Sequence, residues 1–417
     1  MKKITITNAY TWYNKGDAGI LLGIVETLKK LYDKDVEIDV LSFTPEEDKI
    51  RYCKDSTIKN VYSNVLNPHP YKHTKIGKII AVFKLFFSMI YQILTINMSK
   101  KTLINKRENY KSLSEADFIV VCGGGFLGGR KFDSFMHLFQ IYINSKFEKK
   151  VIMMGTSIEP ITNSFVKKIT EKILKNVDYI YAREIITYNY LKSFMPEDKI
   201  ELIPDMAFML EDIKNKLDYV EEWKKNFDVI YGITVRKWDF PEENNGNKLF
   251  ENYKNELAKF IEYKAKKDNV LFVFVPQVIV EHSNDAKVAK EIKELLSDEI
   301  KNHFVILEDD IHPKEVKQLI WNFDYFIGTR MHSNIFAISM GVPTIAIAYE
   351  KKTNGIMHTA ELDDFVLEMN KINFNDLKLI SEKQEKHEKE IRKHLDKRIY
   401  SIRKEILEKI SNKIKEV

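Results

Sequence analysis

The sequence is poor in cysteine and lacks the residue spacings of metal sites and of disulfide-built secreted folds. Cys53 and Cys122 are the only cysteines among 417 residues, and they lie far apart. This favours a reducing cytoplasm over an oxidising compartment. No cluster of histidine, cysteine and carboxylate side chains has metal-ligand spacing, so we predict no required metal and no resident cofactor. The stretch MKKITITNAY has no apolar h-region, and we expect no signal peptide.

An excess of charge of one sign is also missing. Lysine and arginine number 66 against 61 aspartates and glutamates, so the net charge is only +5. Basic and acidic residues are mixed along most of the expected helices, which argues against a nucleic-acid partner. With 44% hydrophobic and 30% charged residues, the chain has the composition of a globular protein and the length of two domains.

One long apolar run, at residues 76–98, departs from this composition. It is nearly long enough to span a bilayer, but Lys84 interrupts it. Basic residues flank the run on both sides, namely Lys72, Lys75, Lys78, Lys100, Lys101, Lys106 and Arg107. Three alternatives are open: a buried core helix, a helix in the membrane interface whose Lys84 snorkels towards water, and a transmembrane span.

Short apolar strand patterns alternate with helical patterns along the whole chain. The strand patterns are KITITN, VEIDVLSF, ADFIVVCGGG, VIMMGTS, VDYIYAR and KIELIPD in the first half, and FDVIYGITVR, NVLFVFVPQ, HFVILED, FDYFIG and PTIAIAY in the second. Such alternation is typical of parallel sheets covered by helices on both faces. We therefore predict an α/β protein with two doubly wound domains, at residues 1–215 and 225–365, followed by charged C-terminal helices at 366–417.

The residues just after the strands are the candidate site residues, because ligands of doubly wound sheets bind beyond the C-terminal ends of the strands. With two such domains, we expect the site in a cleft between them. The residues at these positions are Asn14, Gly16, Asp17, Gly123, Gly124, Gly125, Arg183, Pro204, Asp205, Arg236, Gln277, Arg330 and His332. The arginines predict an anionic ligand, since guanidinium groups match carboxylate and phosphate in a bidentate way. The alternative for each single arginine is a surface ion pair.

Two glycine-containing motifs indicate close approach of the backbone to another group. In YNKGDAG, Gly16 allows a ligand to come near, whereas Asp17 is also explained as the N-cap of the following helix. CGGGFLGG lacks the GxGxxG spacing of a dinucleotide site and the Lys-Ser/Thr of a P-loop. Its glycines therefore predict contact between backbone and ligand, or between backbone and backbone.

The stretch GTRMHSNIF places Arg330 and His332 between a strand pattern and a helix that we expect from near Ser333 to Gly341. Free backbone N–H groups and the helix dipole favour an anion at such a helix start. Histidine can deliver a proton near neutral pH. We interpret the pair as a general acid beside a bound anion; the alternative is a histidine that caps or packs against the helix.

The order of these motifs resembles the polysaccharide pyruvyl transferase family. The resemblance covers roughly residues 4–358, and its most specific part is RMHSNIFAISMGVPTIAIAYEKK. The motifs that carry it are Asn-x-Gly-Asp at 14–17, Gly-Gly-Gly at 123–125, Arg183, Pro-Asp at 204–205, Arg-x-His at 330–332, and Gly-x-Pro followed by Tyr-x-x-Lys at 341–352. The resemblance implies two Rossmann-like domains in a GT-B-like arrangement.

The resemblance also implies a reaction, the transfer of pyruvate from phosphoenolpyruvate to a nucleotide- or lipid-linked sugar as a ketal, in cell-surface polysaccharide biosynthesis. The N-terminal domain would take the acceptor and the C-terminal domain the donor. His332 would protonate the methylene carbon of phosphoenolpyruvate, and Asp17 would orient or deprotonate the acceptor hydroxyl. The implied substrate-binding residues are Arg330, Arg183, Arg236, Asn14, Gly16, Gly123, Gly124, Gly125 and Lys352.

Two other functions are compatible with the same scaffold: a GT-B nucleotide-sugar glycosyltransferase and a non-catalytic sugar- or anion-binding protein. An intact Arg-x-His pair speaks against the second. We expect a cytoplasmic protein, which the interfacial alternative for residues 76–98 would place at the inner face of the cell membrane. The sequence is compatible with a homo-oligomer.

Overall fold

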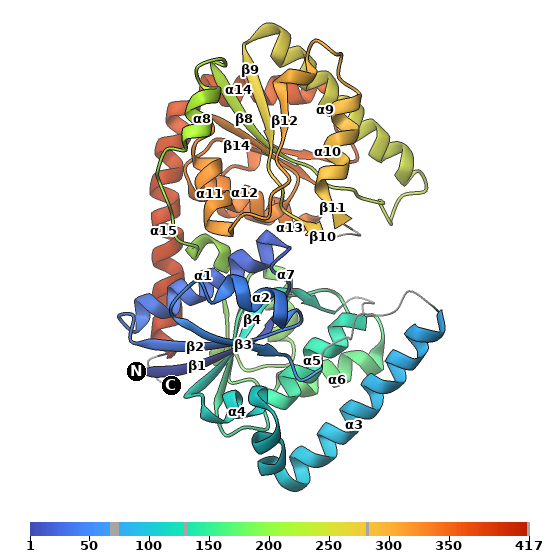
Figure 1. The fold of residues 1–417 in the computed structure, drawn as a ribbon, viewed down its shortest axis with the longest axis vertical. Helices are drawn as coiled ribbons and strands as arrows, with labels where there is room; N and C mark the ends of the chain where they lie inside the picture. Colours follow the sequence, from blue (N-terminus) through green and yellow to red (C-terminus); the bar gives the residue numbers. More distant parts are fainter. Residues whose placement is uncertain (67–74, 129–131, 281–282, 415–417) are drawn as a thin grey trace. The chain divides into compact units, whose positions relative to one another are not determined.

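Apart from one short antiparallel pair, the strands of the described residues form two parallel sheets, each in its own unit (Figure 1). The computed structural model describes residues 1–66, 75–128, 132–280 and 283–414. Unit 1 comprises Met1–Trp12, Ile20–Met209 and Glu405–Val417, and unit 2 comprises Tyr13–Gly19 and Leu210–Lys404. The prediction of an α/β protein with two doubly wound sheets is confirmed.

The sheet of unit 1 has the strand order β3-β2-β1-β4-β5-β6-β7, and its neighbouring strands pair in parallel. Its strands are β1 (Lys2–Ala9), β2 (Val36–Ser42), β3 (Ile58–Ser63), β4 (Phe118–Leu127), β5 (Lys150–Ile158), β6 (Tyr179–Ala182) and β7 (Ile200–Leu202). Its helices are α1 (Lys15–Leu31), which begins in unit 2, α2 (Pro45–Tyr52), α3 (Lys75–Lys106), α4 (Glu108–Glu115), α5 (Phe132–Asn144), α6 (Ser164–Leu174) and α7 (Ile185–Lys192).

The sheet of unit 2 has the order β12-β9-β8-β13-β14-β15, again with parallel neighbours. Its strands are β8 (Val229–Thr234), β9 (Val270–Phe274), β12 (Phe304–Ile306), β13 (Tyr325–Gly328), β14 (Thr344–Ala348) and β15 (Val366–Glu368). Its helices are α8 (Asp218–Trp223), α9 (Gly246–Lys267), α10 (Asp285–Glu294), α11 (Pro313–Trp321), α12 (Met331–Ser339), α13 (Lys351–Thr359), α14 (Phe374–Lys386) and α15 (Glu388–Ile414), which ends in unit 1. A short antiparallel pair joins β10 (Ile279–Val280) to β11 (Ser283–Asn284).

Both sheets have a Rossmann-type strand order, in which the chain starts at the centre and winds outward first to one side and then to the other. The order reverses between β1 and β4 in unit 1, and between β8 and β13 in unit 2. The central strands are almost wholly buried, as continuous runs of apolar residues require. Ligands of such sheets bind beyond the carboxyl ends of the strands at the reversal. We therefore expect a ligand of unit 2 to bind beside the residues that follow β8 and β13.

Residues Tyr13–Gly19 lie with unit 2, although they precede most of unit 1 in the chain. Asn14 forms an antiparallel bridge with Val278, and the Lys15 backbone N–H donates to the carbonyl of Gln277 at 2.9 Å. The Lys15 side chain is fully buried and pairs with Asp310. The sequence placed this segment inside a domain of residues 1–215. Backbone pairing to the segment that follows β9 is what fixes it in unit 2 instead.

The C-terminal helices are divided between the two units and do not form a third part. In unit 2, the Arg403 guanidinium donates to both carboxylate oxygens of Asp212 at 2.7 Å each. In unit 1, Lys409 Nζ donates to the carbonyl of Leu202 and the Lys409 carbonyl accepts from the hydroxyl of Tyr181. The apolar side of α15 is buried along its length, and this burial stabilises the packing of the helix on each unit.

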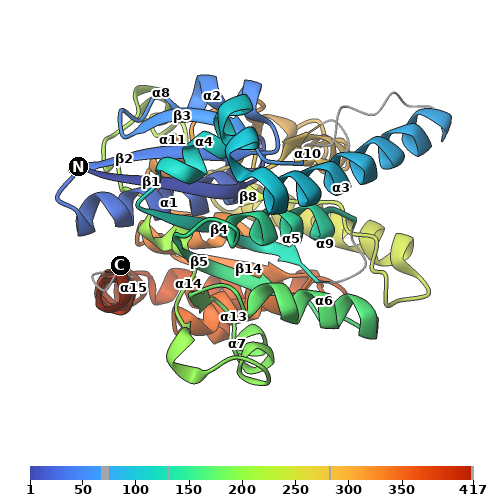
Figure 2. The same cartoon turned by 90° about the horizontal axis from the view of Figure 1, so that it is seen from below.

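Helix α3 contains the apolar run and lies on the outside of unit 1, with its C-terminal end beside α4 (Figures 1 and 2). Most of the described side chains of this run are not buried, so the alternative of a buried core helix is wrong. Val82–Lys106 is long and apolar enough to cross a membrane by length and composition. Lys72 lies outside the described residues. The helix is kinked at Ser99, whose φ of −154° and ψ of 77° are not helical.

Candidate active site

The sequence motifs at 14–17 and 330–332 meet in unit 2. A β-carbon added to Gly16 would lie 2.2 Å from Nδ1 of His332 and 2.5 Å from its Cγ. The backbone of residue 16 comes so close to the imidazole of His332 that only glycine fits at this position. The sequence predicted a close approach at Gly16 but could not say that a histidine makes it.

The loop residues around Gly16 bind one another. Asn14 Nδ2 donates to a carboxylate oxygen of Asp17 at 2.6 Å, and Asn14 Oδ1 accepts from the Gly16 backbone N–H at 3.1 Å. Helix α1 begins at Lys15, so Asp17 lies inside the first turn and the N-cap interpretation of Asp17 is wrong. The carboxylate of Asp17 instead accepts the hydrogen bond from the side-chain amide of Asn14.

Helix α12 begins two residues earlier than the sequence suggested, at Met331, and Arg330 is its N-cap. His332 is thus the second residue of the helix, within the first turn as predicted. Buried hydroxyl groups hold this turn: Thr234 Oγ1 accepts from the Thr329 backbone N–H at 3.2 Å and bonds the Ser333 hydroxyl at 2.8 Å. These contacts fix the backbone from which the side chains of Arg330 and His332 project.

Arg330 is oriented by a buried carboxylate. Its Nε and Nη2 atoms lie 3.0 and 2.5 Å from the two carboxylate oxygens of Asp285, and the Asp285 side chain is 2% exposed. Burial alone would lower the pKa of Arg330, but the charge and hydrogen bonds of Asp285 raise it overall. Asp285 takes only part of the guanidinium's five N–H donors, so the remaining donors can bind an anion. Asp285 is not among the residues predicted from the sequence, because nothing in its local pattern marks it.

Arg236 lies near Arg330 and is held by aromatic rings. Its guanidinium carbon is 4.1 Å from the ring centre of Tyr349 and 4.9 Å from that of Trp238. Burial lowers the pKa of Arg236, and the positive charge of Arg330 lowers it further. Over the residue ranges that the structure describes, no carboxylate forms an ion pair with Arg236. The guanidinium groups of Arg236 and Arg330 therefore lie at the point where the strand order reverses, and that of Arg236 has no carboxylate of the described residues in contact.

Gln277 follows β9 and adds a buried polar group to this region. Its side chain is 2% exposed, and neither its amide oxygen nor its amide nitrogen has a hydrogen-bond partner within the described part of the chain. Its backbone carbonyl binds Lys15, and the next residue, Val278, donates its N–H to Asp285 at 3.2 Å. A buried amide left unsatisfied costs stability, and a ligand that forms hydrogen bonds with it would remove this cost.

The predicted residue Lys352 lies in the first turn of α13, three positions after Tyr349, and is half-buried. The structure thus brings together Asn14, Gly16, Asp17, Arg236, Arg330 and His332 at the carboxyl end of the unit 2 sheet, with Lys352 on the adjoining helix.

The remaining predicted residues lie in unit 1 and make contacts there. The Arg183 side chain is 4% exposed, and its Nη1 donates to the carboxylate of Asp205 at 2.6 Å while its Nε donates to the hydroxyl of Ser157 at 2.6 Å. For a single arginine, the alternative to ligand binding was an ion pair at the surface. Arg183 does form an ion pair, but a buried one. It accounts for Arg183 and for the Pro-Asp motif.

The glycines Gly123, Gly124 and Gly125 lie in β4, where the chain is packed against β5. A β-carbon on Gly123 would be 2.1 Å from the carbonyl oxygen of Met154, and Gly124 has a φ of +147°. Of the two interpretations of this motif, the structure provides contact between backbone and backbone at Gly123.

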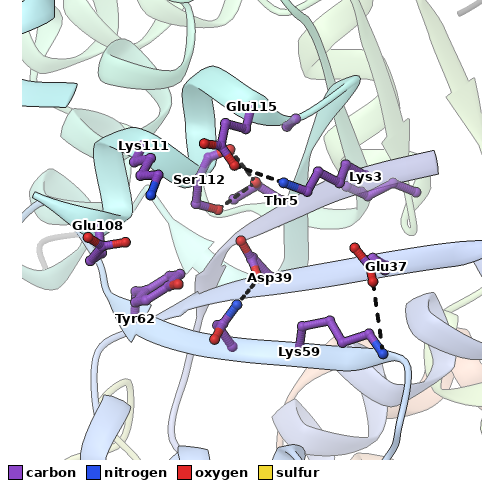
Figure 3. Close-up of a pocket in the computed structure, with 13 residues that line it drawn as sticks. Lys3, Thr5, Glu37, Asp39, Lys59, Tyr62, Glu108, Lys111, Ser112 and Glu115 are labelled. Carbon is purple, nitrogen blue, oxygen red and sulfur yellow. Dashed lines mark hydrogen bonds and ion pairs between the residues drawn. The ribbon is translucent and has the colours of Figure 1, made fainter. Parts of the chain in front are cut away.

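A polar cavity of about 340 Å³ lies elsewhere in unit 1, between the sheet face of β1, β2 and β3 and the helix α4 (Figure 3). Four of its charged side chains form ion pairs within the cavity, Lys3 with Glu115 at 2.8 Å and Lys59 with Glu37 at 4.0 Å. Its residues in the central strand β1, Lys3–Thr5, come from the first half of that strand, away from its carboxyl end. We therefore do not assign it to the site.

Within the described residues, no group of three or more histidine, cysteine, aspartate and glutamate side chains could hold a metal ion. The absence of a required metal remains a prediction.

Comparison with known proteins supports the reading of the motifs. The family model described as polysaccharide pyruvyl transferase matches residues 14–351. The chain is also similar to the amylovoran biosynthesis protein AmsJ of Erwinia amylovora, with 22% identity over 373 residues that make up 85% of each chain.

Two solved structures share the fold. The UDP-GlcNAc 2-epimerase of Methanocaldococcus jannaschii has a TM-score of 0.57 and 16% identity, with 92% of both chains covered. Alr3699/HepE of Anabaena, solved in complex with UDP and glucose, has a TM-score of 0.58 and 13% identity, with 100% of both chains covered. At these identities the likeness concerns the fold alone, and it confirms the expected GT-B-like class.

Proposed function

Because this chain belongs to the polysaccharide pyruvyl transferase family, we propose that it transfers pyruvate from phosphoenolpyruvate to a sugar as a ketal. The family and the relative named for amylovoran biosynthesis support the broader statement that it is a transferase of polysaccharide biosynthesis. The donor and the ketal chemistry are the proposal, and the arrangement of charges in unit 2 supports them.

The observation that carries the proposal is the pair Arg236 and Arg330. Burial and then the charge of Arg330 lower the pKa of Arg236, and among the described residues only Arg330 has a carboxylate, Asp285, in contact, so a bound anion would stabilise the charge of Arg236. Phosphoenolpyruvate carries a carboxylate and a phosphate, so it can use the N–H donors of both arginines. The aromatic rings of Tyr349 and Trp238 fix the plane of Arg236, and Asp285 fixes that of Arg330. Both groups are thus oriented before the donor arrives.

The two titratable groups beside the arginines suit the steps of ketal formation. His332 donates a proton to the methylene carbon of phosphoenolpyruvate while a sugar hydroxyl attacks the adjacent carbon and loses its proton to Asp17. The bond from that carbon to the phosphate oxygen then breaks, and a second sugar hydroxyl attacks the same carbon to close the ketal and gives its proton to the departing phosphate. The products are the pyruvyl ketal and inorganic phosphate. Asp17 directly follows Gly16, whose backbone lies against His332, and this supports assigning the base and the acid to one cluster.

The test is phosphate release from phosphoenolpyruvate over a panel of nucleotide- and lipid-linked sugars. Arg236→Gln should raise the phosphoenolpyruvate concentration for half-maximal rate by roughly tenfold or more, because a hydrogen bond to a charged group contributes about 1.5–3 kcal/mol. The matched control is Lys237→Gln, which changes the exposed neighbour that pairs with Asp239 at 3.8 Å. If no acceptor supports phosphate release and a nucleotide sugar is consumed without phosphoenolpyruvate, the protein is a glycosyltransferase instead.

A further inference from the structure

Helix α3 carries an apolar surface that no described part of unit 1 covers. The side chains that make up this surface, named here the α3 apolar face, are Ile80, Val82, Phe83, Phe86, Phe87, Ile90, Tyr91, Leu94 and Met98, and all of them are exposed. Phe83, Phe87, Ile90 and Leu94 follow one another at three or four residues, so they lie on one side of the helix. Contiguous exposure of this kind, unlike single scattered apolar residues, marks an interaction surface.

The opposite side of α3 is fixed to unit 1 by a buried amide. Gln92 is fully buried; its Nε2 donates to the carbonyl of Val65 at 3.1 Å, and its Oε1 accepts from the hydroxyl of Tyr110 at 2.6 Å. Ile96 and Leu103 of α3 are also buried, in the hydrophobic core of unit 1. These contacts set the rotation of the helix about its axis. The α3 apolar face is therefore turned outward by the fold itself.

The charges of α3 are all of one sign. Its sequence contains no aspartate or glutamate, and its charged residues are Lys75, Lys78, Lys84, Lys100, Lys101 and Lys106. Lys84 and Lys101 are exposed, whereas Lys100 has Glu148 at 3.7 Å. The surface that the helix offers is thus apolar and aromatic with positive charge and no negative charge of its own.

We propose that the α3 apolar face docks this protein onto an anionic lipid bilayer, with α3 lying in the plane of the interface. Aromatic side chains favour the headgroup boundary, and Lys84 can extend its ammonium group to lipid phosphates. A second copy of α3 would bring lysines against lysines, which argues against self-association. A transmembrane span would have to withdraw Gln92 from its buried bonds with Val65 and Tyr110. The proposal concerns location and does not rest on the proposed chemistry.

The experiment is co-sedimentation of the full chain with vesicles of phosphatidylglycerol and phosphatidylcholine, with vesicles of phosphatidylcholine alone for comparison. The variant Phe83→Ser, Phe87→Ser, Leu94→Ser should bind the anionic vesicles at least about tenfold more weakly, because each buried apolar side chain contributes to partitioning. The matched control is Phe165→Ser, Ile185→Ser, Leu379→Ser, which removes equally exposed apolar side chains elsewhere and should bind as the wild type does. Circular dichroism of both variants checks that they are folded.

The charge of the surface is tested in the same assay. Lys84→Glu with Lys101→Glu should weaken binding and reduce its dependence on salt. Lys172→Glu with Lys224→Glu, at exposed positions in α6 and at the C-cap of α8, should not. Absence of wild-type binding to anionic vesicles at low salt overturns the proposal. So does a concentration-dependent dimer that the triple serine variant abolishes, because the face would then be covered by a second copy. No phosphoenolpyruvate is present, so a failure of the proposed reaction leaves this result unaffected.

Discussion

The backbone of Gly16 lies directly against the imidazole of His332, so that a β-carbon at residue 16 would be 2.2 Å from Nδ1 and 2.9 Å from the histidine's own Cβ. Contact with Cβ means that a rotation of the ring alone cannot relieve the overlap. The position of His332, and with it the proposed proton transfer, depends on the absence of a side chain at residue 16.

Gly16→Ala should therefore lower turnover sharply while the protein remains folded. A displacement of about 1 Å in a catalytic group can cost roughly a hundredfold in rate. The control is Gly355→Ala in α13, where a β-carbon would meet nothing within 4 Å and helix propensity improves. Phosphate release and thermal unfolding should be measured on both variants. Wild-type turnover in Gly16→Ala would show that the geometry around His332 does not matter for the reaction.

Arg330→Lys should impair donor use more than its conserved charge suggests. An ammonium group cannot make both bonds to Asp285 and also present a planar set of donors to phosphoenolpyruvate. We expect roughly a tenfold or greater rise in the phosphoenolpyruvate concentration for half-maximal rate, from the loss of about 1.5–3 kcal/mol per charge-assisted bond. Steady-state titration with the donor measures it.

The control for this variant is Arg403→Lys, which weakens another bidentate pair of unit 2, that with Asp212. Both variants should lose thermal stability, but only Arg330→Lys should change donor affinity. Equal effects of the two on donor use would reduce Arg330 to a structural role.

His332→Ala should abolish product formation and leave the donor bound. General acid–base groups contribute about a hundred- to ten-thousand-fold in rate, whereas the arginines hold the anion. Calorimetry with phosphoenolpyruvate and phosphate release with a competent acceptor are the two measurements. His358→Ala, at an exposed histidine beside Asp363, is the control and should behave as the wild type. Loss of donor affinity in proportion to turnover would mean that His332 only binds the donor.

A pH dependence of stability is expected from unit 1. Burial lowers the pKa of His137 to about 3, from an ordinary value near 6.5. Between these values the unfolded chain binds a proton that the folded chain refuses, so the free energy of unfolding falls as pH falls below about 6.5. Asp48 acts in the opposite direction, because burial raises the pKa of its carboxyl to about 6 and the folded state then gains protons first.

His137→Asn, whose amide oxygen can replace the ring nitrogen facing Asn8, should remove the loss of stability in acid and leave the opposite trend of Asp48. Melting temperatures between pH 4 and 7 are compared for the wild type and this variant. Only the slope is informative, because the substitution in the core will also lower stability at every pH. An unchanged slope would mean that His137 is not the residue responsible.

The sequence by itself determined the two doubly wound sheets and the positions where their strands end. Continuous apolar runs such as those of β4 and β13 can be buried only inside a covered parallel sheet, so local pattern was enough. It also placed Arg330 and His332 at the strand-to-helix turn, since such a turn depends on neighbouring residues alone. Helix starts were less certain, and α12 began two residues before its expected position.

The tertiary structure alone decided which of these residues meet and what each one binds. Arg183, Arg236 and Arg330 look alike in the sequence, yet one is buried against Asp205, one lies on aromatic rings and one is paired with Asp285. It also decided that α3 turns its apolar face outward. Partners far apart in the chain are chosen by how the elements pack, and packing leaves no periodic signal in the residues that it brings into contact.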